Sequence, residues 1–73
     1  MAKKENPNYI SKIDDRTNII YPNYHDFESG QEPAIIVKGY NGTVEITQGD
    51  QSIIVPDNAR EDLANLIKIT FIV

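Results

Sequence analysis

His25, Asp26 and Glu28 are the residues whose types come closest to those of a catalytic or metal site. They offer one imidazole and two carboxylates, which are the groups that general acid–base catalysis and metal binding use. Their spacing matches no catalytic or metal-ligating motif, and a lone histidine in a polar segment is most often only solvated or hydrogen-bonded. We therefore expect no catalytic residue and no metal site here.

Other routes to catalysis or cofactor binding have even less support. The chain has no cysteine, which excludes disulfides, thiolate metal ligands and thiol nucleophiles. Its serines lie in no nucleophile elbow and have no lysine companion motif. Gly39 and Gly42 fall inside a predicted hairpin, not between a strand and a helix, so they do not form a phosphate-binding loop. We expect a protein that is not an enzyme and needs no cofactor.

Aromatic residues give a stronger indication of function than the titratable ones. Three of the six fall within seven positions, at or in a long connection between two proline residues, PNYHDFESGQEP. Connections of this length without regular structure are uncommon in compact domains and are often functional. Tyrosine flanked by Asn, Asp and Ser is typical of contact surfaces. The candidate binding residues are Tyr21, Tyr24, His25, Phe27 and Tyr40, and the alternative is that Tyr24 and Phe27 only hold this loop against the core.

Two turn signals predict the elements that position these residues. Asn41-Gly42 is the commonest type I′ pair, and Gly49-Asp50 places glycine first, as a type II′ turn prefers. Both turns together predict a three-stranded antiparallel meander over about residues 34–55, with Lys38 opposite Glu45. The predicted register places six apolar residues on one face: Ile35, Val37, Val44, Ile46, Ile53 and Val55.

A helix over about residues 58–67 follows from capping and spacing. Asn58 and Glu61 match a capping box, and apolar residues then recur at helical intervals, which predicts one face packed on the sheet. Residues 18–21 read as a short strand stopped by Pro22. Residues 69–73 could extend the helix or form a strand, and their β-branched and aromatic composition favours a strand. The fold class is therefore α+β, with short strands flanking the meander.

Size and charge restrict the partners. Residues 1–8 are polar and predict a flexible N-terminal arm before a single domain over residues 9–73. A net charge of −4 opposes binding to nucleic acid. No apolar run suits a signal peptide or a membrane span, which favours a cytoplasmic protein. A chain this small without disulfides, with Ile36 and Ile54 on the face opposite the core, is expected to form a homo-oligomer.

The segment 43–67, TVEITQGDQSIIVPDNAREDLANLI, resembles the C-terminal part of small phage and prophage accessory proteins. The shared pattern is a hairpin, an acidic or proline break, and a helix with apolar residues at Ala59, Leu63, Ala64 and Ile67. The resemblance covers about a third of the chain. It implies a non-enzymatic protein that binds a host or phage component in the bacterial cytoplasm.

The prediction for function is thus a binding protein that engages a protein partner through the loop at residues 21–28. One alternative is an oligomer whose aromatic loops enclose a small, nucleotide-like ligand. Another is a minor structural protein of a virion.

Overall fold

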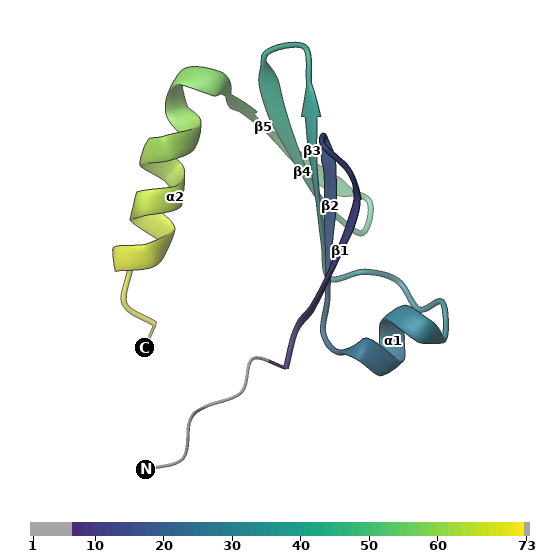
Figure 1. The fold of residues 1–73 in the computed structure, drawn as a ribbon. Coiled ribbons are helices and arrows are strands. Elements are labelled where there is room, and N and C mark those ends of the chain that lie inside the picture. Colours follow the sequence, from purple (N-terminus) through teal and green to yellow (C-terminus); the bar gives the residue numbers. More distant parts are fainter. Residues whose placement is uncertain (1–6, 73) are drawn as a thin grey trace.

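The computed structural model describes residues 7–72, which form a five-stranded sheet and two helices (Figure 1). The five strands are antiparallel and follow their order in the sequence across the sheet. The elements in chain order are β1 (Tyr9–Asp14), β2 (Thr17–Tyr21), α1 (Tyr24–Glu28), β3 (Ile35–Tyr40), β4 (Thr43–Gln48), β5 (Gln51–Pro56), the 3-10 turn η1 (Asp57–Ala59) and α2 (Arg60–Ile69).

The two hairpins β3–β4 and β4–β5 have the predicted register. Asn41 and Gly42 have φ angles of 47° and 74°, and a type I′ turn needs positive φ at both of its central residues. Lys38 consequently pairs with Glu45. In the second turn Gly49 has a φ of 61°, which suits the first central residue of a type II′ turn.

The predicted three-stranded meander is part of a five-stranded sheet, in which the predicted short strand at residues 18–21 is present as β2 and β1 was not predicted. β1 and β2 form a further hairpin around Asp15 and Arg16, and β2 pairs with β3 along its length. At this turn the Arg16 backbone N–H donates to Asp14 Oδ1 at 2.8 Å. A β-bulge between Lys12 and Asp14 shifts the register of β1, which hides the pairing from a simple alternation pattern.

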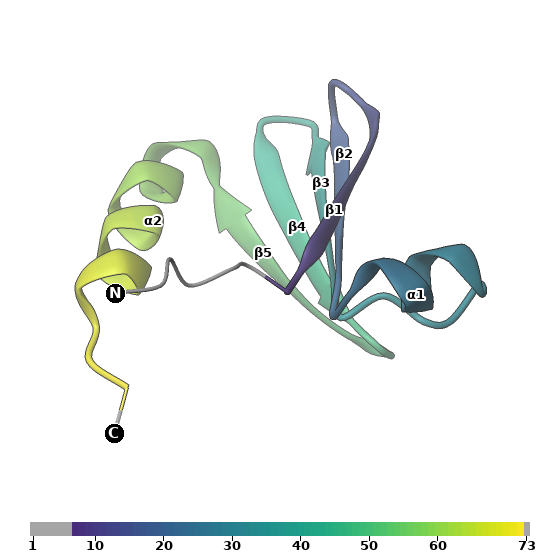
Figure 2. The ribbon, with the colours of Figure 1, turned by 60° about the horizontal axis from the view of Figure 1, so that its bottom comes forward.

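Strand pairing distributes the side chains over two faces. One side, which we call the apolar face, carries eight apolar residues on adjacent strands: Ile10, Ile20, Ile35, Val37, Val44, Ile46, Ile53 and Val55. The opposite face carries Tyr9 and Tyr21 at one end. Figures 1 and 2 show α1 and α2 on opposite sides of the sheet.

The C-terminal helix differs from its prediction in three ways. It begins at Arg60 after η1, with no side-chain cap, so Asn58 and Glu61 do not form the expected capping box. It continues to Ile69, and residues 70–72 have no regular structure, so the predicted strand at 69–73 is wrong for the described residues. Val73 lies outside them.

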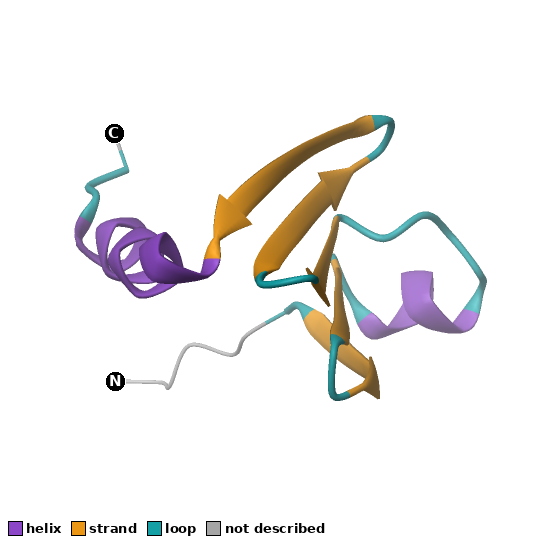
Figure 3. Cartoon of the chain, turned by 90° about the horizontal axis from the view of Figure 1, so that it is seen from above, coloured by secondary structure: helices purple, strands orange, loops and turns teal. Residues whose placement is uncertain are grey.

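The helix also fails to cover the sheet within one chain. Its main contacts are with η1, the turn that precedes it. Leu66 and Ile67, which were predicted to pack on the sheet, are 56% and 66% exposed. Seen from above, α2 lies to one side of the strands (Figure 3).

Most of the predicted N-terminal arm lies outside the described residues. Its residues 1–6 lie outside the described part, and Pro7 and Asn8 lead directly into β1. Among residues 7–72, no helix has the length and apolar character that crossing a bilayer requires.

Candidate functional site

The predicted loop after β2 contains a short helix, α1. Asn23 caps it, because its side-chain oxygen accepts a hydrogen bond from the Asp26 backbone N–H at 2.8 Å. Beyond the helix, the Ala34 N–H donates to the Ile20 carbonyl at 2.9 Å. The connection is therefore fixed at both ends, which corrects the expectation of a segment without regular structure.

Four aromatic rings meet beneath α1, and we call Tyr9, Tyr21, Tyr24 and Phe27 the aromatic cluster. The Phe27 ring contacts the other three, with centroid distances of 4.6 Å to Tyr9, 5.4 Å to Tyr21 and 5.7 Å to Tyr24. Tyr9 and Tyr24 meet edge to face at 5.0 Å and 75°. These separations are those of favourable aromatic pairs, so the cluster holds α1 against the sheet.

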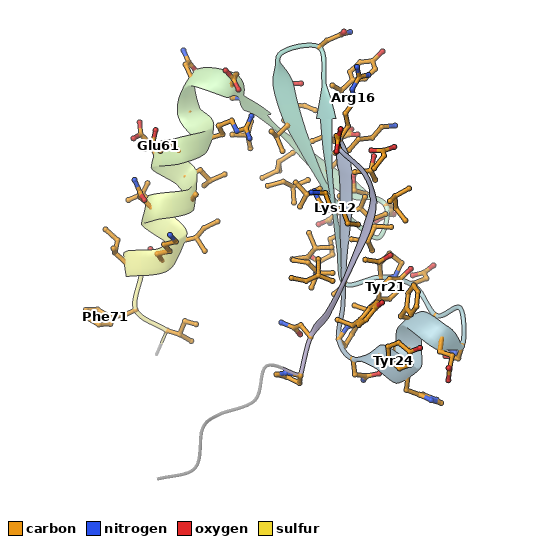
Figure 4. All side chains as sticks on the ribbon, viewed as in Figure 1. Lys12, Arg16, Tyr21, Tyr24, Glu61 and Phe71 are labelled. Atoms are coloured by element: carbon orange, nitrogen blue, oxygen red, sulfur yellow. The ribbon has the colours of Figure 1, made fainter. Side chains whose placement is uncertain are left out.

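The cluster gathers three of the five predicted site residues and separates the other two. Tyr21 of β2 and Tyr24 of α1, both labelled in Figure 4, each contact the ring of Phe27. His25 lies on α1 but is exposed and contacts no ring of the cluster. Tyr40 ends β3 at the far end of the sheet, 64% exposed, so it does not belong to this site.

Tyr9 is the member of the cluster that the sequence reasoning missed. It reaches the cluster because the β1–β2 hairpin places it directly opposite Tyr21. A usable signal was present: tyrosine and isoleucine recur in reverse order, YI and IIY, on the two sides of Asp14-Asp15. Folding the chain at that turn brings the two tyrosines together.

Exposure within the cluster separates packing residues from a contact residue. Tyr9, Tyr21 and Phe27 are half-buried, whereas Tyr24 keeps 53% of its surface exposed. The helix around Tyr24 also carries the exposed acidic residue Glu28, and Glu32 follows it. The site therefore presents one fixed aromatic ring next to negative charge.

Metal-binding groups do not gather here or elsewhere in residues 7–72. No group of three or more His, Asp or Glu side chains within this range has a geometry that could hold a metal ion. His25 therefore belongs to no such group among the described residues.

A hollow lies at the other end of the sheet, with a volume of about 530 Å³. Val37 and Val44 of the apolar face and the charged residues Arg16, Asp57 and Arg60 are among the residues that line it. Arg60 Nη1 and Asp57 Oδ1 form an ion pair at 3.1 Å. Both side chains are more than half exposed, so this pair contributes at most about 1 kcal/mol to stability.

In comparisons with known proteins, no family model, no curated protein and no solved structure matches the chain significantly.

Proposed function

We propose that the protein is a non-enzymatic binding protein that engages a protein partner through Tyr24 and the surface of α1 around it. One observation carries the proposal. The Tyr24 ring is 53% exposed, and yet its contacts with Tyr9 and Phe27 hold it in place. A ring fixed before binding loses little conformational freedom in the complex. Tyrosine is also among the residues that contribute most to binding at interfaces.

The charge around Tyr24 narrows the chemistry of the partner. Asp26 and Glu28 lie on α1, and Glu32 follows in the same connection. Basic residues close to the binding pocket of the partner would complement these carboxylates and speed association. The proposed partner is thus a protein with an apolar pocket for a tyrosine ring and a basic rim.

The cluster favours a protein partner over an enclosed nucleotide-like ligand. Its rings already contact one another at 4.6 to 5.7 Å within one chain, so an enclosed flat ligand would need the aromatic loop of a neighbouring subunit as its second wall. A pocket supplied by the partner, in contrast, needs only the exposed side of Tyr24. The resemblance of residues 43–67 to prophage accessory proteins adds a context, in which the partner is a phage or host protein.

The test is capture of the partner from a lysate of the organism that carries the gene. Immobilised wild-type protein is compared with Tyr24→Ala and with the matched control Tyr40→Ala, which removes another exposed tyrosine, 64% exposed against 53% for Tyr24, at the far end of the sheet. We expect one protein to be retained by the wild type and by Tyr40→Ala, and lost with Tyr24→Ala. Far-UV circular dichroism confirms that each variant is folded.

Two results would overturn the proposal. The first is retention of the same protein by all three baits, which would exclude Tyr24 from the contact. The second is loss of binding with His25→Ala while Tyr24→Ala binds normally, because that outcome assigns the function to the imidazole.

A further inference from the structure

The apolar face is too exposed to be the finished core of a folded protein. Val55, at 6% exposure, is the only buried apolar residue among those described. Ile10 and Ile53, at two strands far apart in the sheet, are 59% and 56% exposed. Contiguous apolar surface of this kind in a natural protein marks a contact with another molecule.

Helix α2 carries the complementary surface. Ala59, the last residue of η1, and the α2 residues Leu63, Leu66 and Ile67 lie at spacings of four, seven and eight and form one apolar stripe. Ala59 and Leu63, nearest the sheet, are half-buried, whereas Leu66 and Ile67 farther along are exposed. The helix therefore starts against the apolar face and then diverges from it, as Figure 1 shows.

The connection between β5 and α2 fixes this direction. The Asp57 backbone N–H donates to the Gly42 carbonyl at 3.1 Å, which ties η1 to the neighbouring β3–β4 turn. The ion pair between Asp57 and Arg60 then spans the start of the helix. A short, tethered connection that points an element away from its own domain favours exchange of that element between two copies.

The exposed area is large enough for the interface of an obligate homodimer. The chain exposes 6533 Å², against ~4,600 Å² for a compact monomer of its mass. The chain thus exposes ~1,900 Å² more than a compact monomer would. Obligate homodimers bury ~2,000–5,000 Å² in total, or ~1,000–2,500 Å² per copy.

We propose that a second copy of this chain covers the apolar face, with α2 of each copy packed on the sheet of the other. The chain itself supplies both halves of the interface, a sheet that lacks a helix and a helix that lacks a sheet. A two-fold axis satisfies both at once, because each copy gives its helix and receives one. The ten residues of α2 span ~15 Å, and strands of six residues span ~20 Å, so the helix fits along the sheet.

Cysteine cross-linking tests the exchange, since the chain contains no cysteine of its own. Leu66→Cys on α2 and Ile46→Cys on the apolar face are prepared as separate full-length proteins, refolded together and oxidised. We expect a disulfide-linked heterodimer that joins positions 66 and 46. The double variant Leu66→Cys/Ile46→Cys should likewise give linked dimers and no internally linked monomer.

Three outcomes of the cross-linking would overturn the proposal. An internal disulfide in a monomeric double variant would show that α2 folds back onto its own sheet. Linked homodimers of Ile46→Cys alone would show two sheets packed face to face. If no cross-link forms and the protein sediments as a monomer, a second copy does not cover the apolar face, and a different protein would have to cover it.

A second measurement avoids any dependence on disulfide geometry. In sedimentation equilibrium the wild type should have twice the 8.3 kDa mass of one chain. Leu66→Glu should sediment as a monomer, whereas the control Asn65→Glu, a neighbouring exposed position off the apolar stripe, should remain a dimer. Because Leu66 is 56% exposed in the single chain, a dimer that persists in Leu66→Glu would contradict the exchange.

Discussion

Replacing Phe27 with alanine tests whether the aromatic cluster is a packed structural unit. Phe27 contacts three rings at 4.6, 5.4 and 5.7 Å, and it is half-buried. Truncation of a fully buried phenylalanine costs ~3–5 kcal/mol, and half burial reduces this to about 2 kcal/mol. For a domain of this size that loss lowers the melting temperature by roughly 8–16 °C.

Urea unfolding followed by far-UV circular dichroism measures this loss. Tyr24→Ala serves as the comparison. The Tyr24 ring is 53% exposed and contacts only two other rings, so its removal should lower the free energy of unfolding by less than ~1 kcal/mol. If Phe27→Ala unfolds at the same urea concentration as the wild type, the cluster does not hold α1. Equal losses for the two variants would also refute the division into a packing residue and a contact residue.

Further perturbations address the turns and the association. Gly42→Val should lower the free energy of unfolding by ~1 kcal/mol, because a β-branched residue is strained at the φ of 74° that Gly42 adopts. An unchanged urea midpoint would contradict the assignment of a type I′ turn at this position. The hydrogen bond from the Arg16 backbone N–H lowers the pKa of Asp14, so this carboxylate stabilises the fold above its unfolded pKa of 3.8. The wild type should therefore be more stable than Asp14→Asn at neutral pH, and this difference should disappear as the pH falls below 3.8 and through the lowered pKa of Asp14 in the folded protein. A stability difference that does not change with pH would contradict this prediction. The wild-type urea midpoint should rise with protein concentration, because the dimer but not the unfolded chain buries the apolar face; a constant midpoint would argue for a stable monomer.

The central hairpins were predictable from sequence because local turn chemistry fixes them. Asn41, Gly42 and Gly49 all require positive φ, and two independent turns agreed on one register. The β1–β2 hairpin carried no such pair, and its bulge at Lys12 to Asp14 breaks the alternation that identifies a strand. The short strand predicted at residues 18–21 is present as β2, whereas β1 was missed for this physical reason.

The ends of the helices were decided by single contacts that patterns do not contain. α1 depends on the cap that Asn23 gives to Asp26. At the end of α2, the Thr70 N–H and hydroxyl both donate to the Leu66 carbonyl, which extends the helix through residues of high β propensity. The apolar stripe of the C-terminal helix was predicted from its spacing. Spacing alone does not show whether such a stripe packs on the sheet of its own chain or on another surface.

The candidate site was predicted in its location and not in its composition. The clustering of Tyr21, Tyr24 and Phe27 in the sequence pointed to the right segment. Tyr40 was grouped with them by residue type alone, and the antiparallel pairing of β2 with β3 places it at the other end of the sheet. Tyr9 was absent because its strand had not been recognised.

The dissociation constant of the purified partner, measured by isothermal titration calorimetry, tests the central claim most directly. Tyr24→Ala should weaken binding about 30-fold relative to wild type, the equivalent of ~2 kcal/mol for an anchor residue. Tyr40→Ala should bind within about twofold of wild type, because its ring lies at the other end of the sheet. Equal affinities for the two variants, with both folded, would contradict the account.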